Sequence, residues 1–172
     1  QRIIRQFVVH HDGVGSSLEC FRVLHDERGL SVHFLIDNNG DIYQTLDLAD
    51  MAFHACVVNP CSIGVELCNR GKVLGPDDAY YKGKNLIRRV ADPVWIHGYR
   101  YEMWEYTSEQ YAAVLHLFSA LLSIFPNLPA VYPDISTKIN QPLGFSGILG
   151  HYHVSKDKWD PGCFDFRRLV KE

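Results

Sequence analysis

Metal-capable side chains gather in three short segments that lie far apart along the chain. The first is the pair His10 and His11, the second is His-Tyr-His at 151–153, and the third is Lys-Asp-Lys-Trp-Asp at 156–160. A catalytic zinc ion needs three protein ligands with nitrogen, oxygen or sulfur donors and one open position for water. Two histidines and one carboxylate from these segments would meet that need and leave a positive charge that polarises a carbonyl group.

Spacing alone does not separate a metal site from ordinary histidines on the surface or at helix caps. The chain has no compact signature such as His-Glu-x-x-His. No two of its five cysteines have the Cys-x-x-Cys spacing of a structural zinc site. Cys56 and Cys61 could form a local disulfide in an oxidising compartment, and five reduced thiols are the alternative.

Composition excludes several classes of partner. The 172 residues include 17 Lys and Arg against 20 Asp and Glu, a net charge of −3 with histidine neutral. This near balance predicts no binding to nucleic acid or to an anionic membrane surface. No apolar run approaches the ~18 to 20 residues that a membrane span needs. The length is typical of one domain, residues 1–172, which we expect to act as a monomer.

Apolar runs and turn signals predict the strands that must position these side chains. Residues 5–11 are typical of a buried strand that ends at the first histidine pair. Residues 32–36 and 42–46 predict two strands, and Asp-Asn-Asn-Gly between them predicts a hairpin turn. Residues 62–67 predict another apolar strand, and 148–154 predict a short strand or strand end.

Capping boxes predict where two helices begin. Ser16 with Glu19 predicts the start of one helix, and Gly29 predicts its end. Leu18, Phe21 and Leu24 would lie on one face of this helix. The clearest helix begins at Thr107 with Gln110 and ends at Pro126. Its apolar face consists of Tyr111, Val114, Leu115, Phe118, Leu121, Leu122 and Phe125.

A final short helix is expected at 164–170, and residues 71–106 are expected to be irregular. The order β-α-β-β-β-α-β-α therefore predicts an α/β single domain. Its central mixed β-sheet would be flanked by α-helices.

Four segments carry the most specific patterns. They are FVVHHDG (7–13), SVHFLIDNNGDIYQTLDLADMAFHA (31–55), NPCSIGVELCN (59–69) and GHYHVSKDKWDPG (150–162). In this order they resemble the zinc-dependent N-acetylmuramoyl-L-alanine amidases, a family that includes bacterial anhydromuramyl-peptide amidases, phage amidase endolysins and peptidoglycan recognition proteins. The resemblance covers about residues 5–169. It implies hydrolysis of the amide bond between N-acetylmuramic acid and L-alanine in peptidoglycan or muropeptides.

The resemblance also implies roles for single residues. His10, His151 and Asp160 match the family's zinc ligands. Glu66 matches the general base of the bacterial branch, which would accept a proton from the attacking water. Lys158 matches the catalytic lysine, which together with Zn²⁺ would stabilise the tetrahedral oxyanion.

Three further residues are implied on the substrate side of the site. His54, His33 and Asn59 match positions that line the family's substrate cleft, although His33 could equally be a core histidine. Strand alternation turns His11 away from the face that presents the first ligand. By the same argument, His153 shares the face of the second ligand and lies further along it.

Two features depart from the commonest family pattern. Val32 occupies the place where many phage and animal members have a catalytic tyrosine, so the proton-transfer role is expected to rest on Glu66. The second departure is an aromatic-rich stretch that forms either one wall of the substrate groove or a separate hydrophobic cluster. Its aromatic residues are Tyr80, Tyr81, Trp95, Tyr99, Tyr101, Trp104 and Tyr106.

Two other functions compete with the amidase. Some peptidoglycan recognition proteins lack part of the metal triad and only bind muropeptide, whereas this chain has the complete ligand set. The third hypothesis is a zinc amidohydrolase of the same fold with another amide substrate, because a shared fold does not define the substrate of an enzyme. Peptidoglycan lies outside the cytoplasm, so an extracytoplasmic location is expected, with the cytoplasm of the family's recycling enzymes as the alternative.

Overall fold

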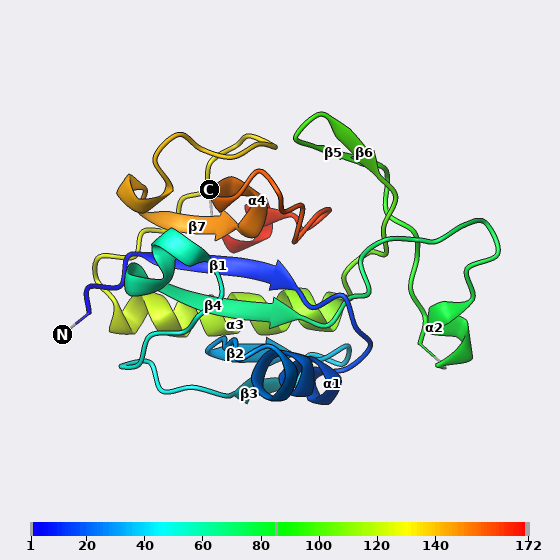
Figure 1. Ribbon diagram of the computed structural model, residues 1–172, viewed down its shortest axis with the longest axis horizontal. Coiled ribbons are helices and arrows are strands. Elements are labelled where there is room, and N and C mark those ends of the chain that lie inside the picture. The colour runs from blue at the N-terminus through cyan, green and yellow to red at the C-terminus, as the bar shows by residue number, and fades with distance from the viewer. Residues whose placement is uncertain (1, 85, 171–172) are drawn as a thin grey trace.

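A five-stranded sheet forms the centre of the computed structural model, which describes residues 2–84 and 86–170. The strand order is β3-β2-β4-β1-β7. Four strands run parallel, and β3 pairs antiparallel with β2 at one edge (Figure 1). The strands are β1 (Gln6–His11), β2 (Phe34–Ile36), β3 (Ile42–Gln44), β4 (Ser62–Leu67) and β7 (Gly147–Gly150).

Parallel pairing brings the carboxyl ends of three strands to the same edge of the sheet. Strand β1 lies between β4 and β7, and its His10 is level with Glu66 of β4. On the other side Val9 is level with Gly150, the residue that precedes His151. Segments more than a hundred residues apart in sequence therefore end side by side (Figure 1).

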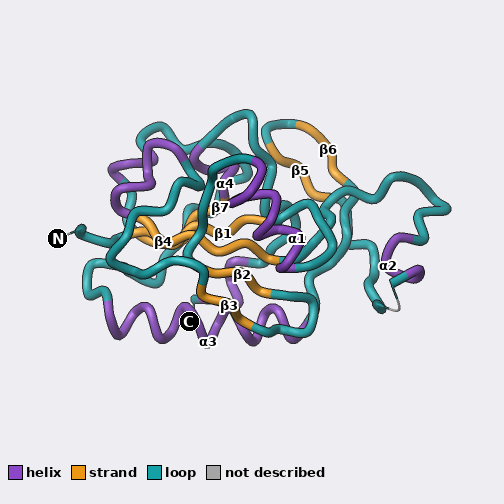
Figure 2. Tube along the Cα trace, turned by 60° about the horizontal axis from the view of Figure 1, so that its bottom comes forward, coloured by secondary structure: helices purple, strands orange, loops and turns teal. Residues whose placement is uncertain are grey.

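Helices cover the two faces of the sheet (Figure 2). The long helix α3 (Ser108–Ile124) lies on one face, and its buried side packs against Phe7 and Val9 of β1. The short helix α1 (Ser17–Phe21) continues into a π-helical turn, Arg22–Glu27, on the other face. The alternating Val8 packs away from α3, against Ala55 and Leu149. By strand alternation His10 shares the face of Val8, which is the face opposite α3.

The predicted α/β fold with a central mixed sheet is confirmed, and so are both helix starts. Thr107 forms a capping box with Gln110, and Ser16 accepts a hydrogen bond from the backbone of Glu19. The apolar face expected for the first helix is not the buried one, because Leu18 and Phe21 are exposed. The small side chains Ser17 and Cys20 face the sheet instead, which brings this helix close to it.

Other elements differ from the sequence prediction in extent. Strand β7 stops at Gly150, and the next residues form a single helical turn, α4 (His151–Val154). The stretch expected to be irregular contains the short helix α2 (Tyr80–Gly83) and a hairpin of β5 (Val94–Ile96) and β6 (Tyr99–Tyr101). The last helix is a shorter 3-10 turn, Phe166–Leu169.

Two absences hold within the described part of the chain. All five cysteines lie within it and are free thiols, so the Cys56–Cys61 disulfide is not formed. Within residues 2–84 and 86–170, no helix combines the length and apolar character needed to cross a bilayer.

The capping box of α3 gives a test of the fold. The Thr107 hydroxyl accepts from the Gln110 backbone N–H and also donates to the Asn38 carbonyl in the hairpin turn. Thr107→Ala should therefore lower the free energy of unfolding by about 1 to 2 kcal/mol in urea titrations. Thr107→Ser keeps the hydroxyl and should stay close to wild type. Equal unfolding midpoints for the two variants would show that the cap does not stabilise the helix.

Candidate functional site

The carboxyl edge of the sheet opens into a cleft of about 210 Å³. Its lining combines side chains from the ends of β1 and β4, the π-helical turn, the loop before β4 and the segment after β7. Charged or polar lining residues include His10, Asp12, Arg28, His54, Glu66, His151, Lys158 and Asp160. A larger hollow of about 660 Å³ lies beside the start of α3, and none of the predicted site residues lines it.

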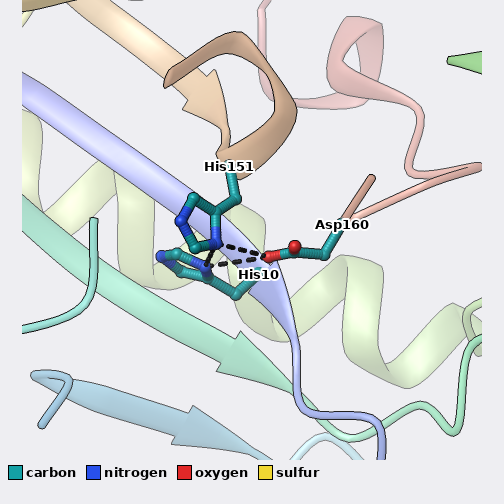
Figure 3. Close-up of side chains that lie close together, drawn as sticks. All are labelled: His10, His151 and Asp160. Atoms are coloured by element: carbon teal, nitrogen blue, oxygen red, sulfur yellow. Dashed lines mark hydrogen bonds and ion pairs between the residues drawn. The ribbon is translucent and has the colours of Figure 1, made fainter. Parts of the chain in front are cut away.

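Three donor atoms converge in the cleft (Figure 3). The Nδ1 atoms of His10 and His151 are 3.1 Å apart, and each lies 3.0 Å from Oδ2 of Asp160. Donors of a tetrahedral zinc ion with bonds of about 2.0 to 2.2 Å are separated by roughly 3.4 Å. The observed triangle is slightly tighter than that, and it is formed by the only donor set of three among the described residues.

The protonation of these groups suits a cation. Burial, and then the neighbouring His151, lower the pKa of His10 to about 4, so its ring is neutral and offers a lone pair. Burial alone would raise the pKa of Asp160, but hydrogen bonds from His10 and His151 outweigh it and hold that pKa well below the ordinary value. A neutral imidazole such as that of His10 and an ionised carboxylate such as that of Asp160 are forms that bind zinc, so these residues fit the metal.

Glu66 enters the same cleft without a protein partner. Its Oε2 atom is enclosed and has no hydrogen-bond partner among the described residues. Burial, with further contributions from Asp160 and Asp12, raises the pKa of Glu66 well above the ordinary value. A carboxylate in this setting takes up a proton readily, which is the property that a general base needs. Lys158 is exposed and also lines the cleft.

His54 lies directly beside His10 of the donor triangle. Its Nδ1 is 2.9 Å from Nε2 of His10, and its Nε2 is 3.0 Å from the hydroxyl of Ser62. The ring still lines the cleft, as expected for a substrate contact, but both of its nitrogens are engaged by protein groups.

Asn59 holds the loop that carries His54. Its amide oxygen accepts from the backbone N–H groups of His54, at 3.2 Å, and Ala55, at 2.7 Å. The residue is buried and does not line the cleft. The structure thus gives Asn59 a role in the geometry of this loop.

His33 takes the alternative role of a core histidine. It is fully buried, accepts from the Gly64 backbone at Nδ1 over 3.1 Å, and donates from Nε2 to the Asp50 carbonyl over 3.2 Å. It does not line the cleft. Its Nδ1 thus pairs the backbone N–H of Gly64, which lies within the buried strand β4.

His153 corrects another prediction. The strand ends at Gly150, so the two histidines lie on a helical turn and residues two apart point in different directions. His153 accepts from the Gly150 backbone N–H and donates to the carbonyl of Ile135, both over 2.9 Å. It therefore fastens a loop to the start of α4, away from the donor triangle.

The aromatic-rich stretch supports the loop that carries Lys158 and Asp160. Tyr101 stacks on Trp159 with ring centroids 4.7 Å apart and planes 2° apart, and His11 packs against the same indole at 4.5 Å. His97 donates to the Lys158 carbonyl over 3.0 Å. These contacts were not predicted, because aromatic density in a sequence does not show what the rings will contact.

The family model of the N-acetylmuramoyl-L-alanine amidases matches residues 1–163. The chain belongs to this family. No curated protein sequence matches it.

Solved structures with the same fold share little sequence with this amidase-family chain. AmiD from E. coli, in complex with anhydro-N-acetylmuramic acid-L-Ala-D-γ-Glu-L-Lys, has a TM-score of 0.65 at 19% identity and covers 96% of this chain. The present chain spans 56% of that AmiD chain. The Ph2119 endolysin from a Thermus scotoductus bacteriophage has a TM-score of 0.60 at 16% identity, with 99% of this chain and 88% of that chain covered.

A relative from animals also shares the fold. Drosophila peptidoglycan recognition protein SD has a TM-score of 0.53 at 15% identity, with 91% of this chain and 73% of that chain covered. Since enzymes and a recognition protein share one architecture, the residues in the cleft have to decide which function this family member has.

The burial of His33 predicts how stability depends on pH. Burial lowers the pKa of His33 to about 4 from the ordinary 6.5. The stability from its neutral form is present above pH 6.5 and is lost as the pH falls towards 4. Between about pH 7.5 and about pH 5 this amounts to roughly 2 kcal/mol. His33→Gln keeps an acceptor for Gly64 but does not titrate, so its unfolding free energy should fall less over this interval. A pH dependence identical to wild type would contradict this account.

Proposed function

We propose that this chain is a zinc-dependent amidase that hydrolyses the amide bond between N-acetylmuramic acid and L-alanine in peptidoglycan or muropeptides. The observation that carries the proposal is the triangle of His10, His151 and Asp160 donors, 3.0 to 3.1 Å on each side, in a cleft shared with Glu66. Family membership and the muropeptide bound to the AmiD relative support the choice of substrate.

Each group in the cleft would have a separate role in the proposed hydrolysis. Bound zinc would supply a Lewis acid that polarises the scissile carbonyl and makes water more acidic. Glu66 accepts a proton from the attacking water and delivers it to the departing nitrogen of L-alanine as the C–N bond breaks. The products are the free lactyl carboxyl group of N-acetylmuramic acid and a peptide with a new amino terminus.

Lys158 and the apolar lining complete the site. The ammonium group of Lys158 lies at the cleft and would stabilise negative charge on the carbonyl oxygen in the tetrahedral state. Val23, Leu24 and Phe53 provide apolar surface beside these charges. This mixture suits a substrate that carries methyl groups next to amides and carboxylates.

All the groups that this chemistry needs come from one chain, so we propose a monomeric enzyme whose partner is peptidoglycan or a muropeptide. Because peptidoglycan lies outside the cytoplasm, we propose an extracytoplasmic place of action if the substrate is intact wall, whereas a small muropeptide also allows the cytoplasm. Intact wall and small anhydro-muropeptide are both compatible with an open cleft, and the assay below distinguishes them.

The reaction is tested by incubating purified protein with intact sacculi and with anhydromuramyl peptide, with and without a chelator. Mass spectrometry should detect free stem peptide that begins at L-alanine, lost on chelation and restored by Zn²⁺. The faster substrate assigns the enzyme to wall degradation or to muropeptide turnover. Binding without cleavage by the zinc-loaded protein would instead identify a recognition module.

The general base is tested by Glu66→Gln. The amide has nearly the same shape but accepts no proton, so kcat should fall by roughly 10² to 10⁴-fold. Zinc content should stay at the wild-type level, because Glu66 is not in the donor triangle. Wild-type turnover in this variant would remove Glu66 from the mechanism, whereas loss of zinc would assign it to the metal site.

The ligands are tested by His151→Ala. The variant should remain folded by circular dichroism, lose bound zinc and lose hydrolysis together, because the donor triangle loses one of its three corners. His25→Ala removes an exposed histidine and serves as the control with unchanged zinc content. Continued zinc-dependent hydrolysis by His151→Ala would refute the metal assignment.

A further inference from the structure

The first ligand, His10, uses both of its ring nitrogens. Its Nδ1 faces His151 and Asp160 in the donor triangle, and its Nε2 lies 2.9 Å from Nδ1 of His54. A neutral imidazole has one N–H and one lone pair. If Nδ1 supplies the lone pair to a metal, the hydrogen must lie on Nε2 and point at His54.

A hydrogen on Nε2 of His10 in turn determines the tautomer of His54. To accept from His10, the Nδ1 of His54 must be unprotonated, which leaves the hydrogen on its Nε2. This nitrogen lies 3.0 Å from Oγ of Ser62, a residue with no exposed surface. With a metal on Nδ1 of His10, the two hydrogen bonds would therefore run in one direction, from His10 to His54 and from His54 to Ser62.

We propose that His54 and Ser62 are positioning residues that fix His10 in the tautomer and orientation that bind metal through Nδ1. The inference rests on the proposed function for the identity of the metal. It replaces the expected role of His54 as a substrate contact. Neighbours that hold the second nitrogen of a histidine ligand orient its ring and tune its affinity for metal.

Strand β4 is shaped to receive the His54 ring. A Cβ atom built on Gly64 would lie 2.6 Å from Nδ1 and 2.7 Å from Cε1 of His54, distances that real Cβ contacts do not show. Ser62, Gly64 and Glu66 alternate with the core residues of β4 and so share the face that carries the site. The missing side chain at position 64 thus leaves the space that the ring fills.

The loop before β4 holds the same ring from its backbone side. Asn59 binds the N–H groups of His54 and Ala55, so the position of the imidazole does not depend on its two ring contacts alone. Three separate residues therefore position the His54 ring: Gly64 leaves space for it, Asn59 binds its backbone and Ser62 contacts its Nε2.

A neutral partner also affects the charge of the site. Zinc with two imidazoles and one carboxylate has a net charge of about +1. A carboxylate in the place of His54 would reduce this charge and make His10 a stronger electron donor to the metal. A second imidazole orients the ligand and leaves the positive charge available to polarise a carbonyl group.

The test is the affinity of the full chain for Zn²⁺, measured by competition with a chromophoric chelator in the absence of substrate. His54→Leu removes the acceptor and should weaken zinc binding by roughly 10 to 100-fold. His54→Asn places an amide oxygen near the former Nδ1 position and should recover most of the affinity. Ser62→Ala should give a smaller loss, and His25→Leu none.

Nitrogen NMR of the histidine rings reports the tautomer of each ring, which a general loss of stability would not change. In zinc-loaded wild type, His10 and His54 should each carry their hydrogen on Nε2. Ser62→Ala should disturb the His54 resonances without unfolding the chain. A folded His54→Leu variant with wild-type affinity overturns the proposal, as does a His10 that binds zinc through Nε2.

Failure of the positioning role and failure of the proposed amidase function give different results. Zinc-loaded wild type that cleaves no muropeptide would refute the amidase, while the affinities and tautomers would still support the positioning role. Wild type that hydrolyses muropeptide, together with His54 variants that bind zinc normally, would overturn the positioning role alone. Wild type that binds no zinc would overturn both.

Discussion

The parallel pairing of β1 with β4 on one side and β7 on the other is the constraint on which the site depends. It aligns His10 with Glu66 and Val9 with Gly150, so a proposed ligand, a proposed base and the residue before a second proposed ligand all reach one edge. A shift of either register by one residue would turn these side chains to the opposite face. The apolar side chains that pack under α3 hold that register, because they alternate with the functional ones.

Several polar side chains are buried near the carboxyl edge of the sheet. His10, His33 and His54 lie in surroundings that lower their pKa values, chiefly through desolvation. An unpaired buried polar group is costly, and here each ring is paired with another ring, a hydroxyl, a carboxylate or the backbone. Glu66 differs, because its Oε2 atom is enclosed and has no partner among the described residues, as is also true of Nδ1 of His11. An unpaired carboxylate suits the proton transfer proposed for Glu66.

The segment between β4 and α3 contributes to the site from outside the sheet. Its hairpin places Tyr101 on Trp159 and His97 on the Lys158 carbonyl, and Tyr106 donates to the carbonyl of Pro161 over 2.7 Å. Aromatic stacking and hydrogen bonding therefore hold the loop that supplies Asp160. Trp95 and Tyr99 of the same hairpin stay exposed. The stretch thus acts mainly as a support, and neither expected alternative describes it fully.

The sequence by itself determined the approximate positions of the strands of the central sheet, the two capped helix starts and the three donors, because periodicity, caps and motif residues are local properties of the chain. It did not determine which face of the first helix is buried, since Leu18 and Phe21 were judged by hydrophobicity whereas close approach to the sheet favours Ser17 and Cys20. It left the role of His33 open between core and cleft, and it did not predict the hydrogen bonds that Asn59 and His153 make to the backbone. Only the tertiary structure decides which nitrogen of a histidine meets which neighbour, because that depends on the approach of segments distant in sequence. The contact between His54 and His10 exists because β4 has a glycine where the ring must fit.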